Sequence, residues 1–377
     1  MIKADSFVNS LIEFGVEFFT GVPDSLLKNF CAYITDHCGK NHVIAANEGG
    51  AVGFAAGCYL ATGKMACVYM QNSGQGNAVN PLASLADPDV YSIPMLLIIG
   101  WRGMPGVHDE PQHVKQGKIT LELMKTLDIP TEILPDATAK ACACVKKLLK
   151  RAMKESRPVA VVVKKGLFED YKLQHKEADI AKVKREAVIE KILKSLPRNA
   201  VVVSTTGMIS REVYETRERL RSKVEVEKGV SCHTRDFLTV GSMGHASQIA
   251  LGIAKMQPKR PVYCIDGDGA SIMQMGNMAI VGQSKCKNLT HIVLNNAAHD
   301  SVGGQPTVGG AIKLRAIAKA CGYKVVHSLH CSTSDLKSST SPKFLELRVA
   351  KGARKDLGRP KEKPQENKAL FMRTLAQ

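Results

Sequence analysis

The stretch VYCIDGDGA, residues 262–270, joins an apolar run to a glycine-rich turn that holds one carboxylate. The apolar half predicts a buried strand, and the glycines let the backbone turn at once into a helix. A second apolar run, residues 290–294, ends in the sequence NNAA at 295–298. In a strand–helix–strand unit of a parallel sheet, the loops after both strands meet at the edge where ligands bind.

The same alternation of apolar runs and helical patterns continues through both halves of the chain. It predicts an α/β fold with two doubly wound parallel-sheet domains. Strands are expected at residues 16–20, 42–46, 65–70, 94–99, 131–134, 158–163, 200–204, 262–266, 290–294, 323–327 and 344–348. Helices are expected at residues 24–35, 49–61, 76–86, 115–126, 138–154, 208–221, 245–256, 271–284 and 311–320. We expect a first domain over 1–165, a linker over 166–186 and a second domain over 187–377, with a surface arm from Lys351.

The composition favours a globular protein over a membrane or nucleic-acid-binding protein. The 377 residues carry a formal net charge of +17, but aromatic residues make up only 5%. A basic surface without a recognition motif is expected to attract small anionic substrates. The longest apolar run, near 93–101, is too short to span a membrane. The 11 cysteines include no CxxC pair, which favours reduced thiols and a cytoplasmic location.

The two strand-end loops carry oxygen donors that suit a metal ion. Carboxylate, amide and carbonyl oxygens are ligands for Mg²⁺, and glycines together with a helix N-terminus favour a phosphate. GDG followed by NN after 28 residues (296 − 268) resembles the cofactor motif of thiamine-diphosphate enzymes. The resemblance implies Asp268, Asn296 and the carbonyl of Ala298 as Mg²⁺ ligands, with Asn295 as the alternative. The other interpretation is two ordinary turns.

Three strand-end loops are candidates for contacts with thiamine diphosphate. Their residues are Thr205, Thr206 and Gly207, Gly241, Ser242 and Met243, and Gly267, Gly269 and Ala270. The segment GSMGH, residues 241–245, resembles the one that keeps the cofactor bent. Met243 is therefore expected to support the bend, and the Gly241 carbonyl to meet the aminopyrimidine amine. The alternative for this segment is a small-residue loop for close helix packing. Many relatives have a hydroxyl residue where Ala270 stands.

A single glutamate, Glu48, begins a helix rich in small residues within NEGGAVGFAAG, residues 47–57. Because a helix N-terminus stabilises negative charge, a capping role is one interpretation. The segment also resembles the glutamate segment of thiamine-diphosphate enzymes. That resemblance implies that Glu48 bonds the pyrimidine nitrogen and so promotes the reactive ylid.

The resemblance also implies an oligomer. Glu48 lies in the first expected domain and Asp268 in the second. In this superfamily, the two domains that share a cofactor usually come from different subunits. We therefore expect a homodimer or a larger homo-oligomer with the cofactor at the subunit interface.

Four further segments narrow the resemblance to the family of phosphonopyruvate and sulfopyruvate decarboxylases. They are GVPDS at 21–25, QNSGQGN at 71–77, GVHDEPQH at 106–113 and SVGGQP at 301–306. The family implies decarboxylation of 3-phosphonopyruvate to phosphonoacetaldehyde and CO₂. Sulfopyruvate decarboxylation and carboligation are the alternatives. A single fused chain favours phosphonopyruvate, because the sulfopyruvate enzymes are often split into two subunits. A protein that binds the cofactor without catalysis is disfavoured by Glu48.

The substrate end of the site needs an acid and a partner for the anionic head group. By analogy with related decarboxylases, Asp24, His108 and His113 are the candidates for proton transfer. The other interpretation of both histidines is that they bond the backbone of their loop. Arg102 and Lys115 flank the histidine loop and are the candidates for binding the phosphonate.

Overall fold

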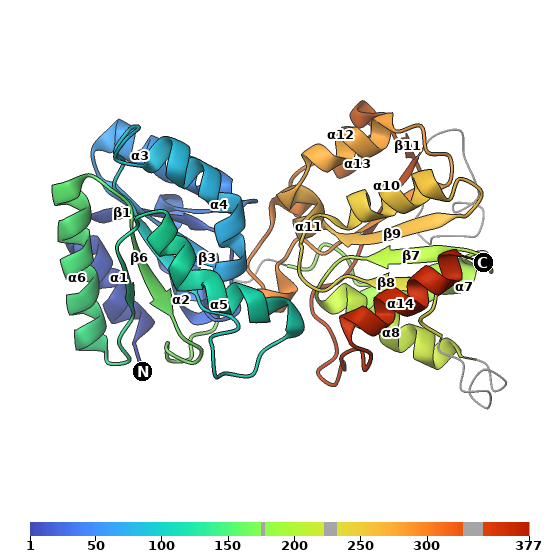
Figure 1. Cartoon of the computed structure of the whole chain (residues 1–377), viewed down its shortest axis with the longest axis horizontal. Coiled ribbons are helices and arrows are strands. Elements are labelled where there is room, and N and C mark those ends of the chain that lie inside the picture. The colour runs from blue at the N-terminus through green and yellow to red at the C-terminus, as the bar shows by residue number, and fades with distance from the viewer. Residues whose placement is uncertain (175–177, 222–231, 327–341, 377) are drawn as a thin grey trace. The chain divides into compact units, whose positions relative to one another are not determined.

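The computed structural model describes residues 1–174, 178–221, 232–326 and 342–376. The chain divides into two compact units (Figure 1). One unit comprises Met1–Glu177 with Ser301–Pro306, and the other comprises Ala178–Asp300 with Thr307–Gln377.

The first unit is built on a six-stranded parallel sheet with the order β2-β1-β3-β4-β6-β5. Its strands are β1 Val16–Gly21, β2 His42–Ile44, β3 Met65–Gln71, β4 Leu96–Gly100, β5 Thr131–Ile133 and β6 Val159–Val163. Its helices are α1 Ala4–Glu13, α2 Lys28–His37, α3 Glu48–Thr62, α4 Gln75–Pro81, α5 Pro111–Thr126 and α6 Thr138–Glu155. Every strand that the sequence predicts in this half forms.

Both faces of this sheet are buried, which explains why its strands are continuous apolar runs. Successive residues of β4 point to opposite sides, so that Leu96 and Ile98 enter one core and Leu97 and Ile99 the other. Helices α1, α2 and α6 supply the first core, and α3, α4 and α5 the second. The helix expected at 76–86 forms in two parts, since α4 gives way after Pro81 to a π-helical turn over Leu82–Ala86, where proline interrupts the regular hydrogen-bond ladder.

The second unit contains a six-stranded parallel sheet with the order β11-β12-β10-β9-β7-β8. Its strands are β7 Val201–Ser204, β8 Asp236–Leu238, β9 Val262–Gly267, β10 Leu289–Asn295, β11 Lys324–Val325 and β12 Lys343–Arg348. Its helices are α7 Arg185–Ser195, α8 Met208–Leu220, α10 Ala246–Met256, α11 Asp268–Met273, α12 Gly276–Gln283, α13 Leu314–Cys321 and α14 Pro364–Leu375. Numbered from its own first strand and read from the other edge, this sheet also has the order 2-1-3-4-6-5.

The second unit departs from the sequence prediction in several places. The helix expected at 271–284 is two helices, α11 and α12, and the strand expected at 323–327 shrinks to β11, with residue 327 outside the described residues. Strand β8 was not expected. The surface arm expected from Lys351 is wrong over its last part, because α14 packs Phe371 into the core beside α10 and α12.

The segment between the domains is more ordered than a linker at its start. Leu167 and Phe168 are buried in the core of the first unit, and the backbones of residues 167 and 169 bond that of Ile2. Within the described residues, no helix is both long and apolar enough to cross a membrane.

Candidate cofactor site

The carboxyl edge of the second sheet holds Asp268, which begins α11 directly after β9. Its side chain is buried, and its carboxylate accepts hydrogen bonds from Thr307 Oγ1 and, at 3.4 Å, from the backbone N of Asn296. Burial raises the pKa of Asp268, and these neutral donors oppose the shift only in part. A divalent cation would offset this desolvation, so the residues present fit the Mg²⁺ ion that the fold family implies.

The loop after β10 is shaped by two turns in which an asparagine side chain bonds its own backbone. Asn295 Oδ1 accepts from the N of Ala297 at 3.0 Å, and Asn296 Oδ1 accepts from the N of Ala298 at 3.1 Å. Ala297 has φ 55°, a left-handed conformation that favours glycine. The turns therefore hold a strained residue between the two asparagines and the carbonyl of Ala298.

The two asparagines differ in what their amides do. Asn295 is fully buried and donates to the carbonyl of Gly309 and to Glu346, both at 2.8 Å. Asn296 lies one position further out, donates to Asp300 at 2.6 Å and keeps its amide oxygen in the loop. Asn295 therefore ties strands and loops together, and Asn296 is the better placed of the two to meet an ion beside Asp268.

A segment that the sequence prediction missed closes this edge of the sheet. A Cβ atom at Gly309 would lie 2.9 Å from the Cβ of Asp268, so only glycine fits there. His299 lies against Gly269, and burial lowers the pKa of His299 to about 4. Thr307, which bonds Asp268, is 39 positions away from it in the chain. No periodic pattern links residues so far apart, so the sequence gave no signal for them.

The other loops predicted to bind the diphosphate converge on the same edge. Thr206 Oγ1, after β7, accepts from the N of Gly241, after β8, at 2.9 Å. A Cβ atom at Gly244 would lie 3.0 Å from the carbonyl of Ala270. The loops at 205–207, 241–244 and 267–270 therefore lie against one another.

The remaining predicted residues of these loops differ in exposure. Thr205 is buried and extends the pairing of β7 by donating to the carbonyl of Ile265 at 2.9 Å. Ser242 is exposed and Met243 half-buried. Gly207 has φ 91° and turns the chain into α8.

In the first unit, Glu48 is the first residue of α3 and is 4% exposed. The helix is capped by Asn47, whose side chain accepts from the N of Gly49 at 2.8 Å, so Glu48 does not serve as the cap. Its carboxylate instead accepts from Asn77 Nδ2 at 2.8 Å, and burial raises the pKa of Glu48. A Cβ atom at Gly74 would lie 2.6 Å from the carboxyl carbon, so Gly74 provides the space for this side chain.

Asp24, after β1, is fully buried at the same edge of the first sheet. Its two carboxylate oxygens accept from Gln71 Nε2 at 2.6 Å and from the N of Leu26 at 3.0 Å. Burial raises the pKa of Asp24 despite these donors and despite the charge of Arg102. Asp24 and Glu48 therefore flank the loop that follows β3.

The two cations predicted to bind the phosphonate have different surroundings. Arg102 forms a two-pronged ion pair with Asp109, in which Nε lies 2.7 Å from Oδ2, and it donates to Ser25 Oγ at 2.8 Å. Lys115 is exposed on α5. Arg102 therefore clamps two loops together, and binding an anion there would require it to share its guanidinium with Asp109.

The two predicted histidines are also separated by burial. His108 is exposed in the loop before α5. His113 is buried on α5, and burial followed by the charge of Arg102 lowers its pKa to about 4. Its Nδ1 atom is buried without a hydrogen-bond partner among the described residues. The structure thus places His113, but not His108, in the buried part of this edge.

Comparisons with known proteins give the two units a family. Residues 1–124 match the N-terminal TPP binding domain of thiamine pyrophosphate enzymes, and residues 223–342 match the C-terminal TPP binding domain. The phosphonopyruvate decarboxylase of Streptomyces viridochromogenes is 36% identical over 97% of this chain and 93% of its own.

Two further relatives each match less than half of the chain. The sulfopyruvate decarboxylase subunit beta of Methanocaldococcus jannaschii is 31% identical over 45% of this chain and 83% of its own. The subunit alpha of Methanococcus maripaludis is 31% identical over 43% of this chain and 95% of its own.

The two parallel sheets and the two matched domains define a thiamine-diphosphate enzyme, a class whose cofactor is held by its diphosphate group. The likeness over nearly the whole chain then narrows the class. The chain belongs to the phosphonopyruvate decarboxylase family of thiamine-diphosphate-dependent decarboxylases. The predictions of an α/β fold, of this cofactor and of a decarboxylase are confirmed.

Proposed function

We propose that the protein converts 3-phosphonopyruvate to phosphonoacetaldehyde and CO₂, with thiamine diphosphate and Mg²⁺ as cofactors. The observation that carries the chemistry is the buried carboxyl of Glu48, which is free of the capping role and bonded by Asn77 at 2.8 Å. The substrate comes from the likeness at 36% identity to a phosphonopyruvate decarboxylase over 97% of the chain.

The residues of the second unit supply the proposed anchor. Asp268, the amide oxygen of Asn296 and the carbonyl of Ala298 would hold Mg²⁺, because these are hard oxygen ligands within one pair of adjoining loops. The loops at 205–207 and 267–270 would hold the diphosphate through backbone N–H groups and threonine hydroxyls. The loop at 241–243 would support the rings.

The residues of the first unit supply the proposed proton chemistry. When bound, thiamine diphosphate supplies the carbon nucleophile and electron sink that decarboxylation needs. Glu48 would hold a proton at its carboxyl against the pyrimidine nitrogen, and its burial, which raises the pKa, favours that bonded form.

Three residues are proposed for the later proton transfer to the product carbon. Asp24 is the best supported, because burial raises its pKa and so favours a carboxyl that can donate a proton. His113, whose pKa is lowered to about 4, would be neutral at pH 7 and better suited to accept one. His108 would need to approach the substrate from its exposed loop.

We also propose that the enzyme is a homodimer or a larger homo-oligomer with its cofactor between subunits. An exposed apolar face on α3 supports this. Gly50, Gly53, Phe54, Gly57 and Leu60 are exposed there, and a Cβ atom at any of the three glycines would meet nothing within 4 Å. Open apolar surfaces of this kind often mark protein interfaces, and this one begins beside Glu48. A cytoplasmic location is supported by the free cysteines of the described residues.

Release of aldehyde from phosphonopyruvate, sulfopyruvate and pyruvate at equal concentrations tests the substrate. We expect phosphonopyruvate to give the highest kcat/KM. A higher value with sulfopyruvate would overturn the proposed substrate and favour that alternative, since the sulfopyruvate decarboxylase subunits are 31% identical to parts of this chain. Activity that survives removal of thiamine diphosphate and Mg²⁺ by dialysis would overturn the proposed chemistry as well.

A further inference from the structure

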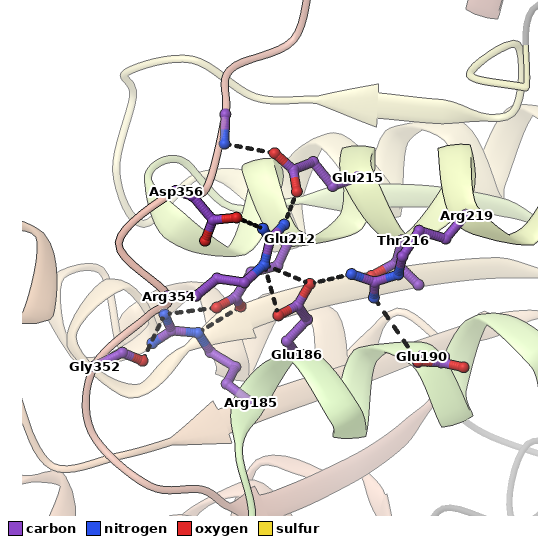
Figure 2. A network of polar contacts seen from close by, with 11 residues as sticks. Arg185, Glu186, Glu190, Glu212, Glu215, Thr216, Arg219, Gly352, Arg354 and Asp356 are labelled. Atoms are coloured by element: carbon purple, nitrogen blue, oxygen red, sulfur yellow. Dashed lines mark hydrogen bonds and ion pairs between the residues drawn. The ribbon is translucent and has the colours of Figure 1, made fainter.

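A buried arginine lies at the inner end of the polar network in Figure 2. Arg185, the first residue of α7, is 5% exposed and forms a two-pronged ion pair with Glu212 of α8, at 2.7 and 3.1 Å. Its Nη2 atom, one of the two that meet Glu212, also donates to the carbonyl of Gly352 at 3.4 Å. Two such buried charges persist only when both are fully hydrogen-bonded.

The same guanidinium also reaches toward the proposed metal loop. Arg185 Nη1 donates to Asp300 Oδ2 at 2.8 Å, and the N of Gly352 donates to that oxygen at 2.9 Å. The third donor to Asp300 Oδ2 is the side-chain amide of Asn296, at 2.6 Å. One carboxylate oxygen thus connects Arg185 to the asparagine proposed as an Mg²⁺ ligand.

The orientation of an asparagine amide matters at a metal site. Its oxygen can bind a cation, but its NH₂ group has no lone pair to offer. The two ends are nearly equal in shape, so only hydrogen bonds decide which one faces the ion. In Asn296 the NH₂ end is held by Asp300, and the oxygen end is held by the N of Ala298 at 3.1 Å.

We propose that Asp300, anchored by Arg185, is a positioning residue that fixes the amide of Asn296 with its oxygen toward the metal. This inference rests on the proposed Mg²⁺ site. One oxygen of Asp300 accepts all three donors, and its side chain is only 12% exposed. Arg185 balances the charge of this carboxylate, and Glu212 in turn holds Arg185 in place. Partners of this kind around a metal ligand commonly change metal affinity about 10–100-fold when they are removed.

The outer part of the network offers matched controls. Arg354 pairs with Glu186, at 3.1 Å, and with Glu215 and Asp356, but no contact recorded for it within the described residues reaches Asp300 or Asn296. Its side chain is 32% exposed. Removal of Arg354 therefore disturbs the same pair of helices, α7 and α8, without touching the amide.

The test is a titration with Mn²⁺, followed by electron paramagnetic resonance, in the presence of thiamine diphosphate and without substrate. We compare the wild type with Asp300→Ala, Asp300→Asn and Arg354→Met, each checked for folding by circular dichroism. We expect Asp300→Ala to weaken Mn²⁺ binding about 10–100-fold and Arg354→Met to change it less than about twofold. Asp300→Asn, which keeps an acceptor oxygen but loses the charge that Arg185 pairs with, should fall between them.

Two results would overturn the inference. Wild-type Mn²⁺ affinity in Asp300→Ala, or in Asp300→Asn should the alanine variant not fold, would mean that metal binding does not depend on a carboxylate anchored by Arg185. An equal loss in Arg354→Met would mean that general loosening of α7 and α8, and not the amide, lowers the affinity. Failure of the proposed metal site looks different, because the wild type itself would then bind no Mn²⁺ with thiamine diphosphate.

Discussion

The two sheets have the same strand order, yet their equivalent loops meet in chemically different ways. The register pairs Gln71 with Gly100 in the first sheet and Gly267 with Leu294 in the second. Asn72 follows Gln71 by one residue, as Asp268 follows Gly267. Arg102 follows Gly100 by two residues, as Asn296 follows Leu294. Asn72 is therefore equivalent to Asp268, and Arg102 to Asn296.

In both units the first side chain reaches across to the backbone of the second. The N of Arg102 donates to Asn72 Oδ1 at 3.1 Å, and the N of Asn296 donates to Asp268 Oδ1 at 3.4 Å. The side-chain amide of Asn72 also donates to the carbonyl of Arg102 and to Thr120, at 2.8 and 2.9 Å. The polar atoms of Asn72 are therefore satisfied by hydrogen bonds, and no charge is buried there. Asp268 has no such protons to give when it is ionised, and its buried charge calls for a cation. If Asp268 binds Mg²⁺ as proposed, the fold sets the position, and the choice of amide or carboxylate there decides whether a metal binds.

The largest effect on turnover is expected at Glu48, the residue of the first unit proposed to hold a proton against the cofactor. We expect Glu48→Gln to retain cofactor binding but to lower kcat about 10²–10⁴-fold, because the carboxyl proton is lost while the shape is kept. Steady-state kinetics and calorimetry with thiamine diphosphate measure the two quantities. The exposed Glu122→Gln on α5 is the control. Near-normal turnover in the Glu48 variant would remove Glu48 from activation.

A second experiment replaces Asp268 of the second unit with asparagine, the residue type of its equivalent, Asn72, in the first unit. We expect Asp268→Asn to weaken Mg²⁺-dependent binding of thiamine diphosphate at least about 10–100-fold. The same variant without cofactor should be as stable as the wild type or more so, because burial raises the pKa of Asp268 and disfavours its charge. Calorimetry and thermal melting check the two arms, and unchanged cofactor binding would remove Asp268 from the metal site.

The reciprocal change puts a carboxylate into the first sheet. In Asn72→Asp the donors to Arg102 and Thr120 are lost, and a buried charge faces a carbonyl. We expect the free energy of unfolding to fall by about 1–3 kcal/mol or more, measured by urea denaturation. A fully stable variant would show that this crossing tolerates charge, and the contrast between the sheets would lose its explanation.

The space around Glu48 can be tested separately from its charge. Because a Cβ atom at Gly74 would collide with the carboxyl group, Gly74→Ala should displace Glu48 and lower kcat about tenfold. Gly76→Ala is the matched control, since a Cβ atom there meets nothing within 4 Å. Equal effects of the two alanines on kcat would contradict a specific role for Gly74.

The smallest effect concerns the dependence of stability on pH without cofactor. Burial raises the pKa of Glu48 above its ordinary 4.5, so between these two values the folded state binds more protons than the unfolded state. Stability contributed by Glu48 therefore falls as pH rises through that window. We therefore expect the Tm of Glu48→Gln minus that of the wild type to rise by a few degrees between acid and neutral pH. Thermal melting at several pH values measures this difference. A constant difference in Tm would contradict the raised pKa.

The sequence was sufficient to predict the elements and loops whose local pattern alone determines their place in the sheet. Buried strands such as β4 and β9 are apolar runs, and strand-end glycines mark the loops that meet at one edge. Strand β8 was not predicted, because it has only three residues and one of them is the charged Asp236. The buried Asp236 forms an ion pair with Arg217 at 2.9 Å. Helix α14 escaped because only Asn367 and Phe371 of its residues are buried.

The site was predicted only as far as the local motifs reach. Asp268 and Asn296 belong to recognisable loops, whereas Asp300 and Arg185 meet only in the folded chain, 115 positions apart. The surroundings that turn Arg102 into a clamp also depend on Asp109 and Ser25, which no sequence pattern connects.

The contact between α14 and β8 has a consequence for synthesis. The side chain of Asn367 accepts from the N of Leu238 at 3.1 Å and donates to the carbonyl of Asp236 at 2.8 Å, so it closes the open edge of the strand. On the ribosome, 126 residues (364 − 238) separate the end of β8 from the start of α14. At about 5–20 residues per second, that edge stays bare for roughly 6–25 s in each nascent chain. During that interval it is a ready template for a strand of another chain, and a chaperone that covers it would raise the yield of folded enzyme.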